Sequence, residues 1–183
     1  MFDFIFRRGN PTNSWRRSDN LALVAALDEP SLNGVRPGAR LDSLSWLGRN
    51  NSVQVETFCY HDLGVGIEFA EDGTLHGYSI ILADEHGEYQ PYRGAVTWNG
   101  SEINLHQLTV DKLASIIGEW YWMDTDENES IVFYEYQTHE LQIELSTSGS
   151  VRRFIVTKDP LMADVKQREL YGVDIAWPPQ FRT

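Results

Sequence analysis

Residues 67–80 read Ile67-Glu-Phe-Ala-Glu-Asp-Gly73-Thr-Leu-His-Gly-Tyr78-Ser-Ile80, and they align without a gap on residues 143–156, Ile143-Glu-Leu-Ser-Thr-Ser-Gly149-Ser-Val-Arg-Arg-Phe154-Ile-Val156. Ile, Glu and Gly recur in the same columns, and the remaining apolar columns exchange one apolar side chain for another. An apolar-periodic segment closed by glycine precedes each copy, at residues 41–48 and 110–118. Because self-similarity at a fixed period marks a repeated supersecondary unit, the sequence predicts two copies of one unit.

The sequence pattern of each copy predicts a helical segment followed by antiparallel strands. Leucine recurs every third residue from Leu41 to Leu47, with Gly48 expected as a left-handed residue after the helix, and Thr109 is expected to cap the second helix. Strand patterns cover residues 53–60, 64–70, 75–82, 92–98, 102–105, 131–136, 140–145 and 151–157. Further helices are expected from residue 18 or 19 to near Pro30, and from Pro160 to near Gly172.

Alternation along the strands assigns their two faces. Leu141, Ile143 and Leu145 point to one side, while Glu140, Gln142 and Glu144 point to the other. Glu68 matches Glu144 in the first copy. We therefore expect an α+β fold of two tandem helix–antiparallel β-meander repeats, with the helices on one face of the sheets. The expected divisions are an N-terminal arm (1–17), a first repeat (18–91), a second repeat (92–158), and a C-terminal helix and tail (159–183).

Composition restricts the function classes. The chain has 183 residues, 42% of them hydrophobic, and a net charge of −12 from 15 basic and 27 acidic side chains. This balance argues against nucleic acid and anionic membranes as partners. The single Cys59 excludes an internal disulfide and a cysteine-rich zinc site, and no cofactor is expected. No apolar run is long enough to span a membrane, and residues 1–8 lack the pattern of a signal peptide, so we expect a cytoplasmic location.

A resemblance to a known fold rests on the turn glycines and core leucines of residues 32–48. These include Leu32-Asn-Gly34-Val-Arg-Pro-Gly38 and Leu44-Ser-Trp-Leu47-Gly48. The pattern resembles the G-x-x-x-G-…-L-x-x-L-G opening of the β-lactamase-inhibitor-protein-like fold, which small outer-membrane assembly lipoproteins share. The resemblance spans roughly residues 20–160. It implies a non-catalytic binder whose tandem form engages a protein partner through its open sheet face.

One segment resembles a calcium-binding loop. Residues 124–135 place oxygen-bearing side chains at loop positions one, three, five, seven and twelve, namely Asp124, Asp126, Asn128, Ser130 and Glu135. Position six is Glu129, whereas the sharp turn of such a loop needs glycine. Because the flanking residues also do not read as two helices, an acidic turn leading into a strand is the competing interpretation.

The second copy is rich in acidic residues. No Lys or Arg lies between Lys112 and Arg152, whereas acidic residues lie at Glu119, Asp124, Asp126, Glu127, Glu129, Glu135, Glu140 and Glu144. Such a run predicts a negative surface that either serves solubility or docks a basic partner. Trp120 and Trp122 border this run and could anchor an interface, although aromatic residues at strand spacing are more often core.

No motif for nucleophilic, phosphate-binding or metal-assisted catalysis is present, and we expect a protein that is not an enzyme. The predicted function is a protein-binding module, with an immunity-type inhibitor of a basic toxin as its most concrete form. The expected binding residues are Glu68, Trp120, Trp122, Glu140, Gln142, Glu144 and Arg153. The alternatives are a structural or regulatory scaffold, or a carboxylate-based hydrolase, which a deep pocket with close carboxylates would distinguish.

Overall fold

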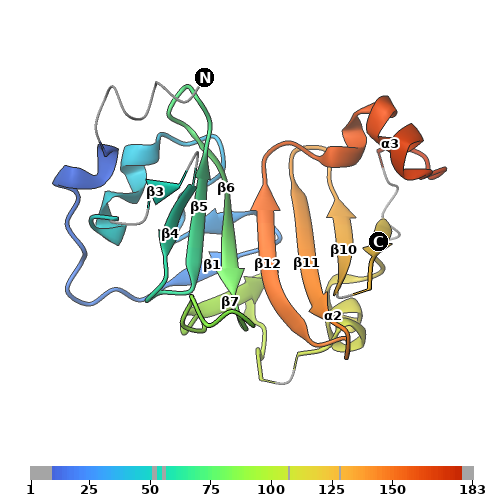
Figure 1. Cartoon of the computed structure of the whole chain (residues 1–183), viewed down its shortest axis with the longest axis horizontal. Helices are drawn as coiled ribbons and strands as arrows, with labels where there is room; N and C mark the ends of the chain where they lie inside the picture. Colours follow the sequence, from blue (N-terminus) through green and yellow to red (C-terminus); the bar gives the residue numbers. More distant parts are fainter. Residues whose placement is uncertain (1–9, 51–52, 55–56, 107, 128, 179–183) are drawn as a thin grey trace.

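The computed structural model describes residues 10–50, 53–54, 57–106, 108–127 and 129–178 (Figure 1). The Phe-rich start of the predicted N-terminal arm lies outside these residues. An eight-stranded antiparallel sheet has the strand order β3-β4-β5-β6-β12-β11-β10-β9. Its strands are β3 (Val53–Gln54), β4 (Thr57–Tyr60), β5 (Val65–Phe69), β6 (Leu75–Ile81), β9 (Trp122–Thr125), β10 (Glu129–Glu135), β11 (Glu140–Ser146) and β12 (Val151–Thr157).

A second sheet has the order β2-β1-β7-β8. It consists of β1 (Val24–Ala26), β2 (Ser31–Leu32), β7 (Ala95–Trp98) and β8 (Ser101–Glu102), and β1 runs parallel to β7. The helical elements are η1 (Pro11–Ser14), η2 (Leu41–Leu47), α2 (Val110–Ile117), η3 (Leu161–Ala163) and α3 (Val165–Tyr171). The predicted α+β class is therefore confirmed. The helices do not all lie on one face of the sheet as predicted, because η3 packs with Trp122 and Phe133 on the side opposite to α2 and η2. None of the helices within the described ranges is long and apolar enough to cross a membrane.

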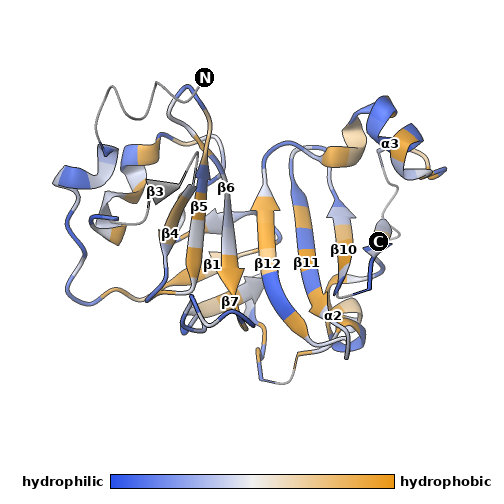
Figure 2. Cartoon of the chain, in the orientation of Figure 1, coloured by the Kyte–Doolittle hydropathy of each residue, from blue (hydrophilic) through white to orange (hydrophobic). Residues whose placement is uncertain are grey.

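One continuous core lies against a single face of the eight-stranded sheet. Alternate residues of its strands, such as Ile67 and Ile143, pack there with leucines of η2, with Leu113 of α2 and with Ala25 of the second sheet. The alternation is visible as hydrophobic and hydrophilic bands along β11 (Figure 2). We call the opposite side of the sheet, which carries residues such as Gln142 and Glu144, the open face.

The sheet consists of two consecutive antiparallel meanders. The first meander is β3–β6, the second is β9–β12, and they join through antiparallel pairing of β6 with β12. The two predicted sets of strands thus form one sheet by edge-to-edge pairing. A register shift occurs between Glu68 and Phe69 in the first meander, and another between Glu144 and Leu145 in the second.

Each meander is fastened to its helical segment by the same contacts. The Tyr60 hydroxyl donates to the Gly48 carbonyl at 2.9 Å, and the Tyr134 hydroxyl donates to the Gly118 carbonyl at 2.9 Å. The amide of the first helical residue donates to a turn glycine in both cases, from Leu41 to Gly73 and from Val110 to Gly149. These hydrogen bonds fix each helical segment across the end of a hairpin.

The predicted helix from residue 18 or 19 to Pro30 is wrong. The structure forms a turn at Asp19–Asn20 and then strand β1. Leu23, Ala25 and Leu27 are all buried, so the burial period here is two and not 3.6. This segment is a strand because it pairs with β7, which is distant in the sequence. Tertiary context here overrides the local preference for a helix.

Two further predictions need correction. Leu41–Leu47 is a 3₁₀ helix, in which a spacing of three residues places all three buried leucines on one side. Gly48 has a positive φ of 83°, but its ψ of 178° is not that of a left-handed helical residue. The strands β7 and β8 belong to the second sheet instead of the meanders. Thr109 caps α2 as predicted, accepting from the Lys112 amide at 3.4 Å.

Candidate functional site

The predicted binding residues on the open face lie near the junction of the two meanders. Glu144 and Arg153 are directly opposed on β11 and β12, and Arg153 Nη1 donates to Glu144 Oε1 at 3.2 Å. Burial raises the pKa of Glu144, and the Arg153 charge opposes this shift. Gln142 is half-buried two residues before Glu144 on β11, and Glu68 is half-buried on β5, which β6 separates from β12. The structure thus brings these four polar residues to one face of one sheet.

Glu140 does not contribute to an exposed acidic surface, which corrects the sequence prediction. Its side chain is only 1% exposed, and Glu140 lies directly opposite Glu135, which is fully buried. Glu140 Oε2 accepts from the Leu161 amide at 2.8 Å, and Glu135 Oε1 accepts from the Met162 amide at 3.2 Å. Burial, together with the neighbouring Glu140, raises the pKa of Glu135 well above its usual range. The pair therefore holds a proton at neutral pH.

This carboxyl pair is a site that the sequence reasoning missed. Paired acids are the pattern of general acid–base chemistry, but the main chain of Leu161 and Met162 closes over both groups. Neither described hollow of the molecule is lined by Glu135 or Glu140. The sequence contains one signal for this pairing. A short hairpin turn over residues 136–139 places Glu135 directly opposite Glu140.

The two tryptophans lie in separate environments. Trp120 is half-buried against the main core on the helical side of the sheet. Trp122 is 8% exposed and stacks on Phe133, with ring centroids 4.0 Å apart, beneath the C-terminal segment, residues 160–178. Met162 is fully buried in the same cluster, and the Tyr121 hydroxyl donates to the Ile175 carbonyl at 2.7 Å. Trp122 is therefore not available as an exposed interface anchor while this segment is docked.

The calcium-loop interpretation is contradicted by the geometry. Asp124 lies in β9 and Ser130 in β10, so the segment is a β-hairpin, and Asn128 lies outside the described residues. Glu135 is at the far end of β10, about 17 Å from Ser130 at the usual rise of a strand, and its carboxyl group faces Glu140. Within the described part of the chain, no cluster of three or more potential metal ligands occurs.

The acidic run is distributed over three environments. Glu135 and Glu140 are buried, whereas Glu129 and Glu144 lie beside Arg152 and Arg153. The exposed acids of the run are Glu119, Asp124, Asp126 and Glu127, of which the last three lie in or beside the β9–β10 hairpin. The exposed negative charge of this run, apart from Glu119, therefore lies at the β9–β10 hairpin.

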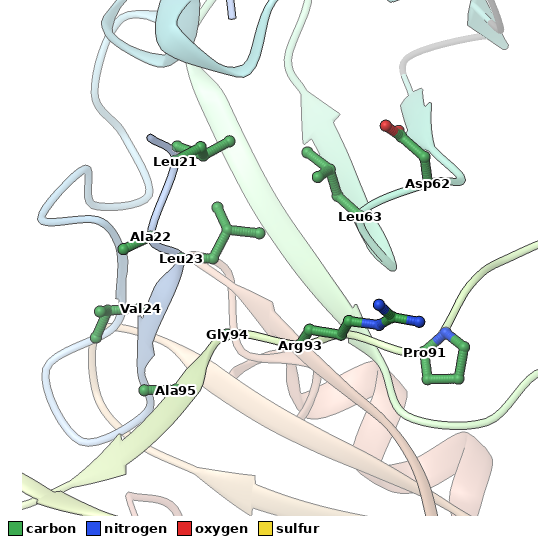
Figure 3. Close-up of a pocket in the computed structure, with 10 residues that line it drawn as sticks. All are labelled: Leu21, Ala22, Leu23, Val24, Asp62, Leu63, Pro91, Arg93, Gly94 and Ala95. Atoms are coloured by element: carbon green, nitrogen blue, oxygen red, sulfur yellow. The ribbon is translucent and has the colours of Figure 1, made fainter. Parts of the chain in front are cut away.

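A hollow of about 380 Å³ lies where the chain enters β1 and β7, on the first-meander side of the molecule (Figure 3). Leu21, Leu23 and Leu63 point toward it, and Arg93 extends along its side to Pro91. No motif in the sequence indicated this site, because its walls come from three segments distant in the chain.

The fold is similar to that of YjgB, a DUF4309 family protein from Bacillus subtilis subsp. subtilis str. 168, with a TM-score of 0.52 and 14% sequence identity. The match covers 72% of this chain and 88% of that chain. At this identity the likeness concerns the fold alone. No protein-family model and no curated protein matches the sequence.

Proposed function

We propose that this protein is a non-catalytic protein-binding module that docks its partner on the open face of the eight-stranded sheet. The observation that carries the proposal is the partial covering of the open face, where the C-terminal segment packs over Trp122 and Phe133 at one side of the sheet. The core and both α2 and η2 pack on one face, whereas no helix among the described residues crosses the centre of β11 and β12 on the other (Figure 1). Half-buried Gln142, Arg153 and Ile155 lie there, a mixture of polar and apolar groups suited to a protein interface.

The internal correspondence of the meanders supports a tandem origin for this face. The tyrosine–glycine hydrogen bonds, the amide contacts to turn glycines and the register shifts all recur at equivalent places. We interpret the meanders as two copies of one unit, which is the arrangement implied by the resemblance to inhibitor-type binders. In this interpretation the junction of β6 and β12 is the centre of the docking surface.

The charge distribution favours a basic partner that approaches from the second meander. The exposed acids of the β9–β10 hairpin border the open face, while Glu144 and Arg153 neutralise each other at its centre. Charges at the rim of an interface accelerate association and are screened by salt. An immunity-type inhibitor of a basic toxin is the form of binder that combines these properties, and a cytoplasmic location follows from that role.

Affinity capture at low and high salt tests the proposal. Gln142→Arg enlarges a side chain at the centre of the open face, and the pair Asp124→Lys with Glu127→Lys reverses charge at the hairpin. Ser115→Arg on the exposed side of α2 and Asp19→Lys in the turn before β1 are the matched controls. The wild type and both controls should recover the same basic protein at low salt, and the open-face and hairpin variants should lose it. Capture that is indifferent to Gln142→Arg would refute the docking surface.

A further inference from the structure

The hollow beside Arg93 forms because two neighbouring segments of the chain diverge. β1 and β7 are hydrogen-bonded from the point where the Ala95 amide donates to the Leu23 carbonyl at 2.9 Å. Before that point the segments 21–22 and 91–93 separate, and the turn between β4 and β5 closes the third side with Asp62 and Leu63. A volume of about 380 Å³ lies within the usual range of small-molecule sites.

The walls of the hollow combine apolar side chains with one uncompensated positive charge. Leu21, Leu23 and Leu63 face the space, and the Arg93 guanidinium lies at its edge (Figure 3). The carboxylate of Asp62 also lines the hollow, but Arg17 engages both of its oxygens, with Nη2 donating to Oδ1 at 3.3 Å. This contact with Arg17 lowers the pKa of Asp62. The carboxylate of Asp62 is therefore already paired with Arg17.

Arg93 has no partner that neutralises its charge within the described residues. In the described ranges, Arg93 forms no hydrogen bond or ion pair, although the chain has 27 acidic and 15 basic residues. Carboxylates pair with Arg17, Arg36, Arg40, Arg152 and Arg153. Arg16 and Arg49 also lack a carboxylate partner in the described ranges, but of these three arginines Arg93 alone lines either of the two described hollows.

The glycine next to Arg93 allows a close approach between β7 and the segment before β1. A Cβ atom on Gly94 would lie 2.4 Å from the Leu23 carbonyl oxygen and 2.4 Å from the Tyr92 hydroxyl. Glycine is therefore needed for β7 to approach Leu23, and the same approach positions Arg93 at the edge of the hollow. A second hollow of about 430 Å³ is also lined by Arg93 and Gly94.

We propose that this hollow binds a small organic carboxylate with an apolar body. The planar guanidinium of Arg93 matches a carboxylate in bidentate geometry, and Leu21, Leu23 and Leu63 provide the apolar contact. The site is separate from the open face, and its occupation does not depend on the protein-binding function. The unpaired guanidinium selects a carboxylate, and the apolar wall selects an apolar body. Ligand pockets typically combine a few polar groups with an apolar lining in this way.

Titration with benzoate, followed by the backbone amide resonances of Gly94 and Ala95, tests this site. The uncharged analogue benzamide and the short anion acetate are the matched probes. Benzoate should give saturable shifts, and each of the two matched probes should bind about tenfold more weakly, since each lacks one of the two contacts. Arg93→Gln should weaken benzoate binding about tenfold, whereas Arg36→Gln, which removes an exposed arginine elsewhere, should leave it unchanged.

Arg93 is exposed, so its replacement should leave the circular dichroism spectrum and the unfolding midpoint unchanged. The proposal is overturned if benzoate gives no saturable shift, if benzamide or acetate binds as tightly as benzoate, or if folded Arg93→Gln binds benzoate as the wild type does.

Discussion

The first and second meanders share the side that faces the core and differ on the open face. Equivalent core positions keep their apolar character, as in Ile67 and Ile143, or Tyr78 and Phe154. On the open face the equivalent positions differ in size and charge. Gly66, Gly77 and Ser79 of the first meander correspond to Gln142, Arg153 and Ile155 of the second.

The coverage of the open face differs as well. The C-terminal segment packs over Trp122, Phe133 and the Glu135–Glu140 pair in the second meander. Core packing therefore restricts one side of such a unit, while the other side is free to diverge. Differences in stability and binding between the meanders should therefore originate on the open face.

The largest expected effect concerns the shared core. Ile67→Ala and Ile143→Ala each remove a fully buried side chain, so each should lower the free energy of unfolding by about 2–5 kcal/mol. Denaturant unfolding of both variants measures this. Because β6 pairs with β12, both losses should appear in a single cooperative transition. Two transitions, only one of them shifted by each variant, would show that the meanders unfold independently.

The next effect is specific to the second meander and depends on pH. The pKa of Glu135 is raised in the folded state, so its stabilising contribution is complete below the unfolded pKa and is lost as pH rises through the folded pKa. Glu135→Gln cannot ionise and avoids this loss. Its stability relative to the wild type should increase by about 2 kcal/mol between pH 4.5 and pH 9. Glu140→Gln should show the same direction, and parallel pH profiles for wild type and both variants would contradict the shared proton.

A smaller effect tests why the first meander has small residues. A Cβ atom on Gly77 would lie 2.3 Å from the Val156 carbonyl oxygen and 3.2 Å from the Thr157 Cα. Gly77→Ala should therefore destabilise by about 1–3 kcal/mol in thermal or denaturant unfolding, because the neighbouring strand must move. Ser79→Ala, two residues along β6, is the control and should change stability by less than about 0.5 kcal/mol. Equal losses of stability in Gly77→Ala and Ser79→Ala would show that close packing against β12 is not the reason for glycine at position 77.

The smallest effect compares equivalent hydrogen bonds. Tyr60→Phe and Tyr134→Phe each remove a hydroxyl that donates to a glycine carbonyl at 2.9 Å. Each should cost about 1 kcal/mol, and the double variant should cost the sum because the two sites are distant. Chemical denaturation of the single and double variants provides the measurement. A loss from only one of the two would show that the contacts are not equivalent in energy.

The sequence predicted β5, β6, β10, β11 and β12, because alternation around Ile67 and Ile143 and the turn glycines are local signals. The predicted single strand over residues 53–60 is wrong, because β3 and β4 are two antiparallel strands there, and β9 was not predicted. The β1 segment was misread as a helix since its partner β7 is about 70 residues away, and local spacing does not reveal such pairing. The burial of Glu140 was missed for a similar reason, because the covering main chain of Leu161 and Met162 comes from outside the repeat.

Site-specific photo-crosslinking tests the central claim most directly. A photoreactive phenylalanine analogue replaces Gln142 on the open face, or Ser115 on the exposed side of α2, and the protein is irradiated in its native lysate at low salt. We expect a covalent adduct with a basic protein from position 142, lost at high salt, and none from position 115. An adduct from position 115 alone would contradict docking on the open face.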